Sequence, residues 1–244
     1  MRTLIWDIET SPIKAYIWQA KTDFVTHDKI IQDWFMLTWA AKWEDDEQVH
    51  YGRLTKAEAE AKDDSRIVKK LARLVESADV LVAHNGDRFD LPKLRTRMLV
   101  HGMKPLPPVA TVDTLKQARS TFGFFSNRLD YLAKTLGNPG KHHTDFQLWV
   151  DAMHGDTSSL KRMDEYCRND VVELERVYKT LKPHIKLPRM VESTGVKCTA
   201  CGSDDLQRRG YHRSKVATYQ RFQCKGCGSW CRSRKSLEGK LSTT

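Results

Sequence analysis

Residues 3–10 have the sequence TLIWDIET, which predicts a β-strand. Its period of two places Ile5 on one face and Leu4, Trp6 and Ile8 on the other. Asp7 and Glu9 then project together from the opposite face. Two close carboxylates repel each other unless a cation lies between them. The pair therefore predicts a divalent-metal site, although Asp7 could instead only end the strand as a turn residue.

A second acidic site is predicted at residues 84–90, HNGDRFD, at the end of the apolar run of residues 78–84. That run predicts a buried strand, and the carboxyl end of a strand in an α/β sheet is a usual place for a ligand. Asp90 opens the next predicted helix, where it could alternatively be only an N-cap. Asn85 either contacts a substrate strand or holds the loop, and Phe89 is expected to anchor the loop in the core.

The third acidic motif, YCRNDV at residues 166–171, lies within a long helical pattern over residues 158–181. Tyr166 and Asp170 are four residues apart, so they lie on one face of the predicted helix. The alternative is that Asp170 is an ordinary acid on the solvent side of a helix.

The remaining patterns predict an α/β fold with one mixed sheet flanked by helices. Residues 35–43 and 48–54 predict two strands joined as a hairpin by an acidic turn, with their aromatic residues in the core. The other predicted elements are helices at 64–77 (capped by Ser65), 91–100, 127–136 and 144–153, and a short strand at 111–113.

In their order along the chain, WDIET, HNGDRFD and YCRNDV resemble the motifs of the DEDD superfamily of 3′–5′ exonucleases, over residues 1–185. The tyrosine four residues before Asp170 resembles the tyrosine-type (DEDDy) subgroup, because a histidine-type member would have His where this chain has Glu165. The likeness is greatest to the proofreading domains of family B DNA polymerases, and it implies a ribonuclease H-like fold.

The resemblance also implies a mechanism. Two Mg²⁺ or Mn²⁺ ions would be held by four acids, with Asp7 bridging them, and would promote hydrolysis of a terminal phosphodiester. The four implied metal ligands are Asp7, Glu9, Asp90 and Asp170. Tyr166 would orient the attacking water, because a phenol with an ordinary pKa of about 10 is a poor base at neutral pH. The expected substrate is nucleic acid, with DNA favoured over RNA and single strands favoured over duplexes.

The charge of the chain is unevenly distributed. The 244 residues carry a net charge of +10, of which residues 191–244 hold +7 and residues 1–190 only +3. A basic excess favours a polyanionic partner such as nucleic acid. The sequence has no apolar run of about 20 residues, which excludes a membrane-spanning helix, and MRTLIWDIET lacks the apolar core of a signal peptide. We therefore expect a cytoplasmic protein with no membrane partner.

Five of the six cysteines lie in the last 47 residues, and four of them form two CxxCG motifs. Paired cysteines in a reducing compartment indicate metal rather than disulfides, and this spacing predicts one structural Zn²⁺ in a zinc ribbon. The predicted ligands are Cys198, Cys201, Cys224 and Cys227, with Cys231 as a spare. The predicted organisation is a nuclease domain at 1–186, a linker at 187–196, a small β-rich ribbon at 197–233 and a flexible basic tail at 234–244.

Cations and aromatic residues alternate in the ribbon, a composition typical of single-strand binding. A solvated basic face or a protein-binding ribbon is the alternative. The candidate nucleic-acid contacts, besides Asn85, are Arg208, Arg209, Arg213, Lys215, Tyr219, Arg221 and Trp230.

Two other functions are compatible with parts of the pattern. One is a ribonuclease H-like endonuclease of the transposase or resolvase type, which would cut internally. The other is a zinc-dependent nucleic-acid-binding protein whose nuclease-like domain is only a scaffold.

Overall fold

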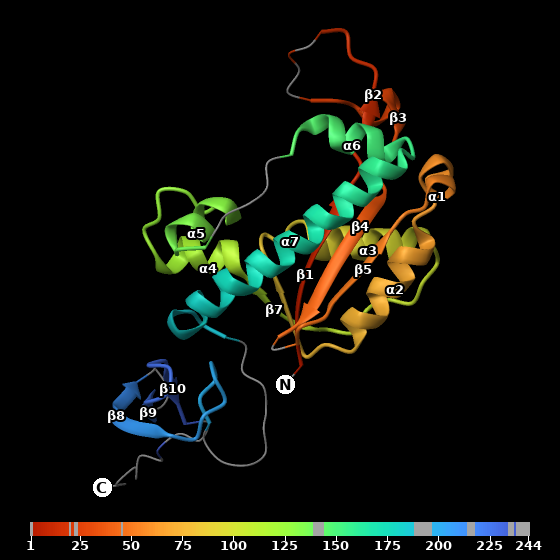
Figure 1. The fold of residues 1–244 in the computed structure, drawn as a ribbon. Coiled ribbons are helices and arrows are strands. Elements are labelled where there is room, and N and C mark those ends of the chain that lie inside the picture. Colours follow the sequence, from red (N-terminus) through yellow and green to blue (C-terminus); the bar gives the residue numbers. More distant parts are fainter. Residues whose placement is uncertain are drawn as a thin grey trace, which may run out of the picture. The chain divides into compact units, whose positions relative to one another are not determined.

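A computed structural model describes residues 2–19, 21, 24–44, 46–138, 144–187, 197–213, 218–233 and 237. The chain forms two compact units, Met1–Tyr178 and Lys179–Thr244, which are described separately (Figure 1). Most of the predicted linker at 187–196 and of the predicted tail at 234–244 lies outside the described residues, and so does Lys215.

The larger unit is built on a five-stranded mixed sheet of order β5-β4-β1-β6-β7. Its central strand, β1, is antiparallel to β4 and parallel to β6. The hairpin predicted from residues 35–54 is confirmed, since β4 pairs antiparallel with β5. The strands are β1 (Thr3–Thr10), β4 (Met36–Trp43), β5 (Val49–Arg53), β6 (Val80–Ala83) and β7 (Ala110–Asp113); a separate small hairpin joins β2 (Lys14–Ala15) to β3 (Ile30–Gln32). The predicted mixed α/β architecture is therefore correct.

Strand β1 is buried on both faces in its first half, where Leu4, Ile5 and Trp6 are at most 1% exposed. Leu4 and Trp6 are buried in the core, in the same cluster as Leu71 of α2 and Leu94 of α3. The helices are α1 (Lys56–Ala61), α2 (Ser65–Glu76), α3 (Asp90–Val100), α4 (Thr114–Thr121), α5 (Leu129–Thr135), α6 (Phe146–Met153) and α7 (Thr157–Leu181), with short 3-10 turns at His27–Lys29 and Lys182–His184.

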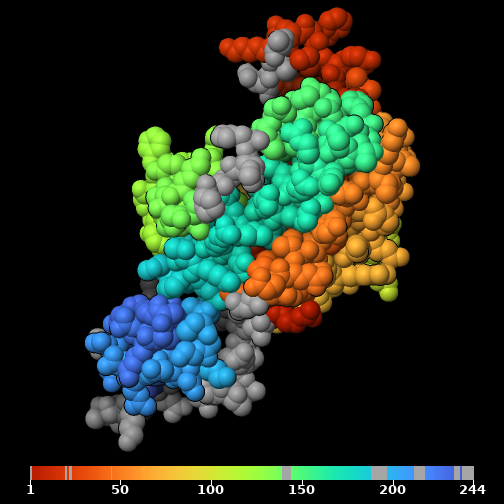
Figure 2. All heavy atoms as spheres, viewed as in Figure 1, coloured from red at the N-terminus to blue at the C-terminus, as the bar shows by residue number. Residues whose placement is uncertain are grey.

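The long helix α7 lies across the sheet (Figure 1), and in the space-filling view it lies beside the orange residues around β5 (Figure 2). Ion pairing and stacking join the two elements: Arg53 of β5 lies 3.4 Å from Asp164 of α7. The guanidinium of Arg168 lies 4.7 Å from the ring centroid of Tyr51. These contacts position the face of α7 on which Tyr166 and Asp170 were predicted.

Two local predictions are wrong, and two short helices were not predicted. Helix α2 begins at Ser65 itself, after Asp64, so Ser65 is not its cap. Phe89 is 37% exposed and does not anchor its loop in the core. Helices α1 and α4 were not expected, because both are short; α1 begins with a capping box between Thr55 and Glu58.

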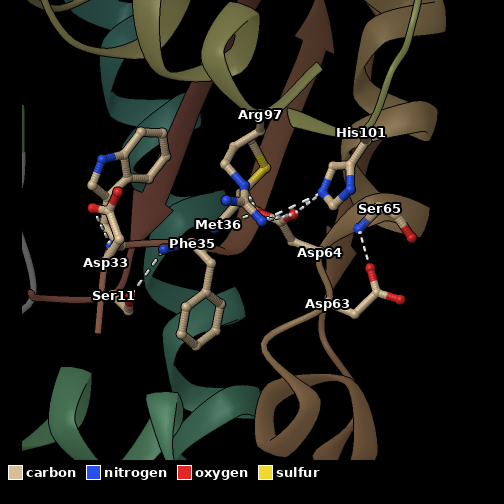
Figure 3. A network of polar contacts seen from close by, with 10 residues as sticks. Ser11, Asp33, Phe35, Met36, Asp63, Asp64, Ser65, Arg97 and His101 are labelled. Atoms are coloured by element: carbon tan, nitrogen blue, oxygen red, sulfur yellow. Dashed lines mark hydrogen bonds and ion pairs between the residues drawn. The ribbon is translucent and has the colours of Figure 1, made fainter. Parts of the chain in front are cut away.

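The buried carboxylate of Asp64, which precedes α2, forms hydrogen bonds with residues of both α3 and β4 (Figure 3). Asp64 is fully buried and accepts hydrogen bonds from the amide of Met36 (2.7 Å) and from Nε and Nη2 of Arg97 (2.7 Å each). Nε2 of His101 lies 2.5 Å from the same carboxylate. Since α3 begins at Asp90, this cluster also fixes the helix that bears one of the predicted catalytic acids.

The smaller unit contains a three-stranded antiparallel sheet of order β10-β9-β8. Its strands are β8 (Leu206–Arg213), β9 (Thr218–Cys224) and β10 (Trp230–Arg232), with a bulge between Arg208 and Tyr211. Within the part of the chain that the structure describes, no helix combines the length and the apolarity that a membrane crossing needs.

Candidate active site

Three of the predicted acids come together where β1 meets α7. Carboxylate oxygens of Asp7, Glu9 and Asp170 all lie within 4.8 Å of one another. Asp7 and Glu9 share a face because of the period of the strand, and Asp170 is brought to them by α7, where it is buried. Three negative oxygens at this separation are the donor set of a hard divalent cation, so the residues present fit Mg²⁺ or Mn²⁺.

The fourth acid, Asp90, is held differently. It is 1% exposed, and its Oδ1 accepts a hydrogen bond from the amide of Ile8, at 3.1 Å, between the two acids of β1. Burial, aided by the charge of Asp113, raises the pKa of Asp90 to about 7, against the effect of the Ile8 hydrogen bond. Asp90 lies outside the three-oxygen cluster, and its role as a metal ligand stays a prediction.

A buried thiol lies beside Asp7. Cys167 is fully buried, and its Sγ lies 3.6 Å from the backbone oxygen of Asp7 and 3.7 Å from Oδ2 of the same residue. Burial raises the pKa of this thiol well above its ordinary value, and the charges of Asp7, Glu9, Asp170 and Asp90 raise it further. The thiol is therefore neutral, and it donates to the acid cluster without adding charge.

Trp149 of α6 is a residue of this site that the sequence did not reveal. Its Nε1 donates a hydrogen bond of 3.1 Å to Oε2 of Glu9. Its ring also meets the ring of Tyr166 edge to face, with centroids 5.7 Å apart and planes at 78°. One side chain thus orients an acid and the tyrosine together. In the sequence, Trp149 was only one more aromatic residue in a helical pattern.

Asp113, at the end of β7, shapes the loop that precedes Asp90. Its Oδ1 accepts hydrogen bonds from the amides of Asn85 (3.0 Å) and Leu115 (3.0 Å), so it both holds the loop and caps α4. Asn85 has a φ of +68°, a left-handed backbone conformation that Asn tolerates better than most residues. The backbone of Asn85 therefore helps to hold the loop, through its amide. A contact between Asn85 and a substrate stays a prediction.

Gly86, the next residue of the loop, packs tightly against Ala83. A Cβ at that position would lie 2.3 Å from Cβ of Ala83 and 3.6 Å from Oδ2 of Asp90. Any larger residue would displace the loop next to the buried carboxylate.

In the smaller unit, the sulfurs of Cys198, Cys201, Cys224 and Cys227 lie within 4.8 Å of one another. The Cys198–Cys227 and Cys201–Cys224 sulfur pairs are each 3.6 Å apart. A tetrahedron with Zn–S bonds of about 2.3 Å has edges of about 3.8 Å, so the four residues fit one Zn²⁺.

The two knuckles have the same backbone geometry. The amide of Gly202 donates to the carbonyl of Cys198, and that of Gly228 donates to the carbonyl of Cys224, both at 2.9 Å. Both glycines have positive φ values, +75° and +76°, which the turn requires. Cys231 does not belong to the four-sulfur cluster.

The residues of the ribbon that were predicted to contact nucleic acid differ in their exposure to solvent. Arg208, Arg209, Arg221 and Trp230 are exposed. Tyr219 is half-buried. The side chain of Arg213 and all of Lys215 lie outside the described residues.

Comparison with known proteins agrees with this fold. The model of the RNase_H superfamily matches residues 33–182, which is more than half of the chain and includes Asp90, Tyr166 and Asp170. No curated protein matches significantly. A solved family B DNA polymerase from the hyperthermophilic archaeon Pyrobaculum calidifontis is similar in structure, with a TM-score of 0.50 and 20% identity over 75% of this chain. This chain spans 24% of the polymerase, and the likeness shows the fold alone. On the evidence of its sheet, its acid cluster and the family match, the chain belongs to the RNase_H superfamily.

Proposed function

We propose that this protein is a metal-dependent 3′–5′ exonuclease that removes nucleotides from single-stranded nucleic acid, with DNA preferred. Membership in the RNase_H superfamily supports a nuclease. The observation that most supports the catalytic site is the grouping of Asp7, Glu9 and Asp170 within 4.8 Å, since side-chain oxygens from two distant parts of the chain meet there. The order of the three acidic motifs supports the 3′–5′ direction by resemblance.

In this proposal, Asp7, Glu9, Asp90 and Asp170 hold two divalent cations, which when bound supply an activated water and neutralise the phosphate. Trp149 keeps the Glu9 carboxylate turned toward Asp7 through its indole hydrogen bond. Tyr166, packed edge to face against the Trp149 ring, orients the attacking water with its hydroxyl. The buried Asp90 supports the backbone of β1 between the two other acids by accepting the Ile8 amide.

The ribbon has a separate role in the proposal. One Zn²⁺ on the four cysteines stabilises a module of about 40 residues that has too little core of its own. Its buried cluster consists mainly of Cys198, Ala200 and Cys224, which is consistent with that requirement. The basic residues around the metal then bind the nucleic-acid strand.

The polarity of hydrolysis tests the proposal. Linear DNA and RNA strands labelled at either the 5′ or the 3′ end are incubated with the protein and Mg²⁺ or Mn²⁺. We expect immediate release of a labelled mononucleotide from the 3′-labelled strand and progressive shortening of the 5′-labelled strand. A circular single strand should resist the enzyme. Cleavage of the circle would instead favour the endonuclease alternative, and no product from any substrate would favour the scaffold alternative.

A further inference from the structure

One face of the ribbon sheet presents arginines and aromatic rings in alternation. In the register of β9 with β10, Arg221 lies directly opposite Arg232, and Gln223 lies opposite Trp230. Tyr219 shares this face because it lies two residues from Arg221 on β9. The pairing is diagonal: the guanidinium carbon of Arg221 lies 4.8 Å from the Trp230 ring centroid, and that of Arg232 lies 3.9 Å from the Tyr219 centroid. We call these four residues the Arg–aromatic face.

The two arginines are an unfavourable pair within the protein itself. Like charges directly opposite each other destabilise an antiparallel ladder. Asp205 forms an ion pair with Lys225 (3.5 Å). Among the described residues, neither Arg221 nor Arg232 forms an ion pair with an acidic residue. Nε of Arg232 is buried without a hydrogen-bond partner. An anion placed between the two guanidinium groups would remove this cost.

The aromatic part of the face is available to a ligand. Trp230 is 51% exposed although it is a large apolar side chain. The Arg221 guanidinium is fixed beside it, because its Nε donates a 3.0 Å hydrogen bond to the carbonyl of Arg209 across the bulge of β8. The opposite face of β9 bears Phe222 and Cys224, both buried. The sheet therefore has an inner face toward the cysteine cluster and an outer face of cations and rings.

We propose that the Arg–aromatic face is a binding site for single-stranded nucleic acid without base preference. Arg221 and Arg232 contact the phosphates, and the Trp230 indole stacks on a base. This inference rests on the proposed function, since the bound strand is the one that the acidic site hydrolyses. An acidic protein segment would satisfy the arginines but would leave the exposed indole without a stacking partner, so the nucleic acid is favoured.

Fluorescence anisotropy of the zinc-loaded full chain with a labelled oligothymidylate of about 12 nucleotides, in the absence of Mg²⁺ and Mn²⁺, tests the proposal. Trp230→Ala should weaken binding about 5- to 100-fold. The double variant Arg221→Gln, Arg232→Gln should lower the slope of log Kd against log salt by about 1.4, since each phosphate contact on a single strand contributes about 0.7. The matched control is Lys69→Gln, which removes an exposed cation from α2 of the larger unit and should change Kd by less than about twofold.

Two further measurements separate the possible failures. Zinc content shows whether each variant keeps its folded ribbon. If Trp230→Ala loses its metal, Trp230→Phe replaces it as the test variant. Since Trp230→Phe retains an aromatic ring, it should bind the oligonucleotide nearly as well as the wild type. Hydrolysis of the p-nitrophenyl ester of thymidine 5′-monophosphate reports on the acidic site without the ribbon, and no hydrolysis would refute the nuclease but not the binding face. Equal binding by wild type and the face variants, or full displacement of the oligonucleotide by polyglutamate at equal charge, would overturn the inference.

Discussion

Replacing Asp64 by Asn is expected to destabilise the larger unit strongly. The wild-type carboxylate is fully buried and receives three hydrogen bonds of 2.7 Å, two of them from Arg97. Asparagine can still accept from the Met36 amide, but it leaves the Arg97 guanidinium buried without a counter-charge. Breaking a buried ion pair by removing one partner costs about 3–5 kcal/mol. Urea unfolding followed by tryptophan fluorescence should therefore show a lower transition midpoint with an unchanged slope.

The neighbouring residue provides the control. Asp63 is exposed and accepts a hydrogen bond from the amide of Ser65 at 2.9 Å, so Asp63→Asn should cost about 1 kcal/mol or less. A double-mutant cycle isolates the pair: Asp64→Asn combined with Arg97→Met should cost less than the sum of the single changes. An additive cycle, or a loss below about 1 kcal/mol for Asp64→Asn, would refute the reasoning that this cluster holds α3 to the sheet.

Trp149→Phe removes the hydrogen bond to Glu9 but keeps a ring beside Tyr166, so Mn²⁺ affinity measured by calorimetry should fall about tenfold with an unchanged Tm; unchanged affinity would contradict the orienting role. Removing Zn²⁺ with a chelator should make the ribbon sensitive to limited proteolysis while residues 1–178 stay protected, and added Zn²⁺, unlike Mg²⁺, should restore it. Equal digestion with and without the metal would count against a structural zinc. A hydrogen bond from Arg66 lowers the pKa of Glu58 from 4.5 to about 2, so the stability it adds is present above pH 4.5 and is lost as the pH falls toward 2. Glu58→Gln should accordingly cost about 1 kcal/mol at neutral pH, after solvent screening, and nothing once the pH is well below about 2; a cost independent of pH would contradict this origin.

The elements that were predicted from the sequence are those with a regular pattern of apolar residues over a long continuous segment. The strand period of β1 and the helical spacing of α7 were enough to place Asp7, Glu9 and Asp170 on the correct faces. Their meeting in space followed from the resemblance to known motifs, because no local pattern indicates that residues more than 160 positions apart are neighbours. The two CxxCG motifs predicted the sulfur cluster without such a resemblance, because each knuckle is a local turn that brings its own two sulfurs together.

The missed features depend on tertiary contacts. Trp149 belongs to the site only because α6 brings its indole to Glu9, and Asp113 because β7 ends beside the loop at Asn85. The wrong prediction for Phe89 has the same cause. The loop is held by backbone hydrogen bonds to the Asp113 carboxylate, so it needs no aromatic anchor, and the Phe89 ring lies instead on the surface, 5.0 Å from Nζ of Lys93.

The rate of 3′-terminal nucleotide release by Asp170→Asn under single-turnover conditions is the most direct measurement of the central claim. Asparagine keeps the size of the side chain and removes one negative oxygen from the cluster with Asp7 and Glu9. We expect the rate with saturating Mg²⁺ to fall by about 10³-fold, or about 4 kcal/mol in the barrier, while the Tm and the binding of a single strand stay close to wild type. A variant that folds normally and releases the 3′ nucleotide within about tenfold of the wild-type rate would contradict the assignment of this acid cluster as the catalytic centre.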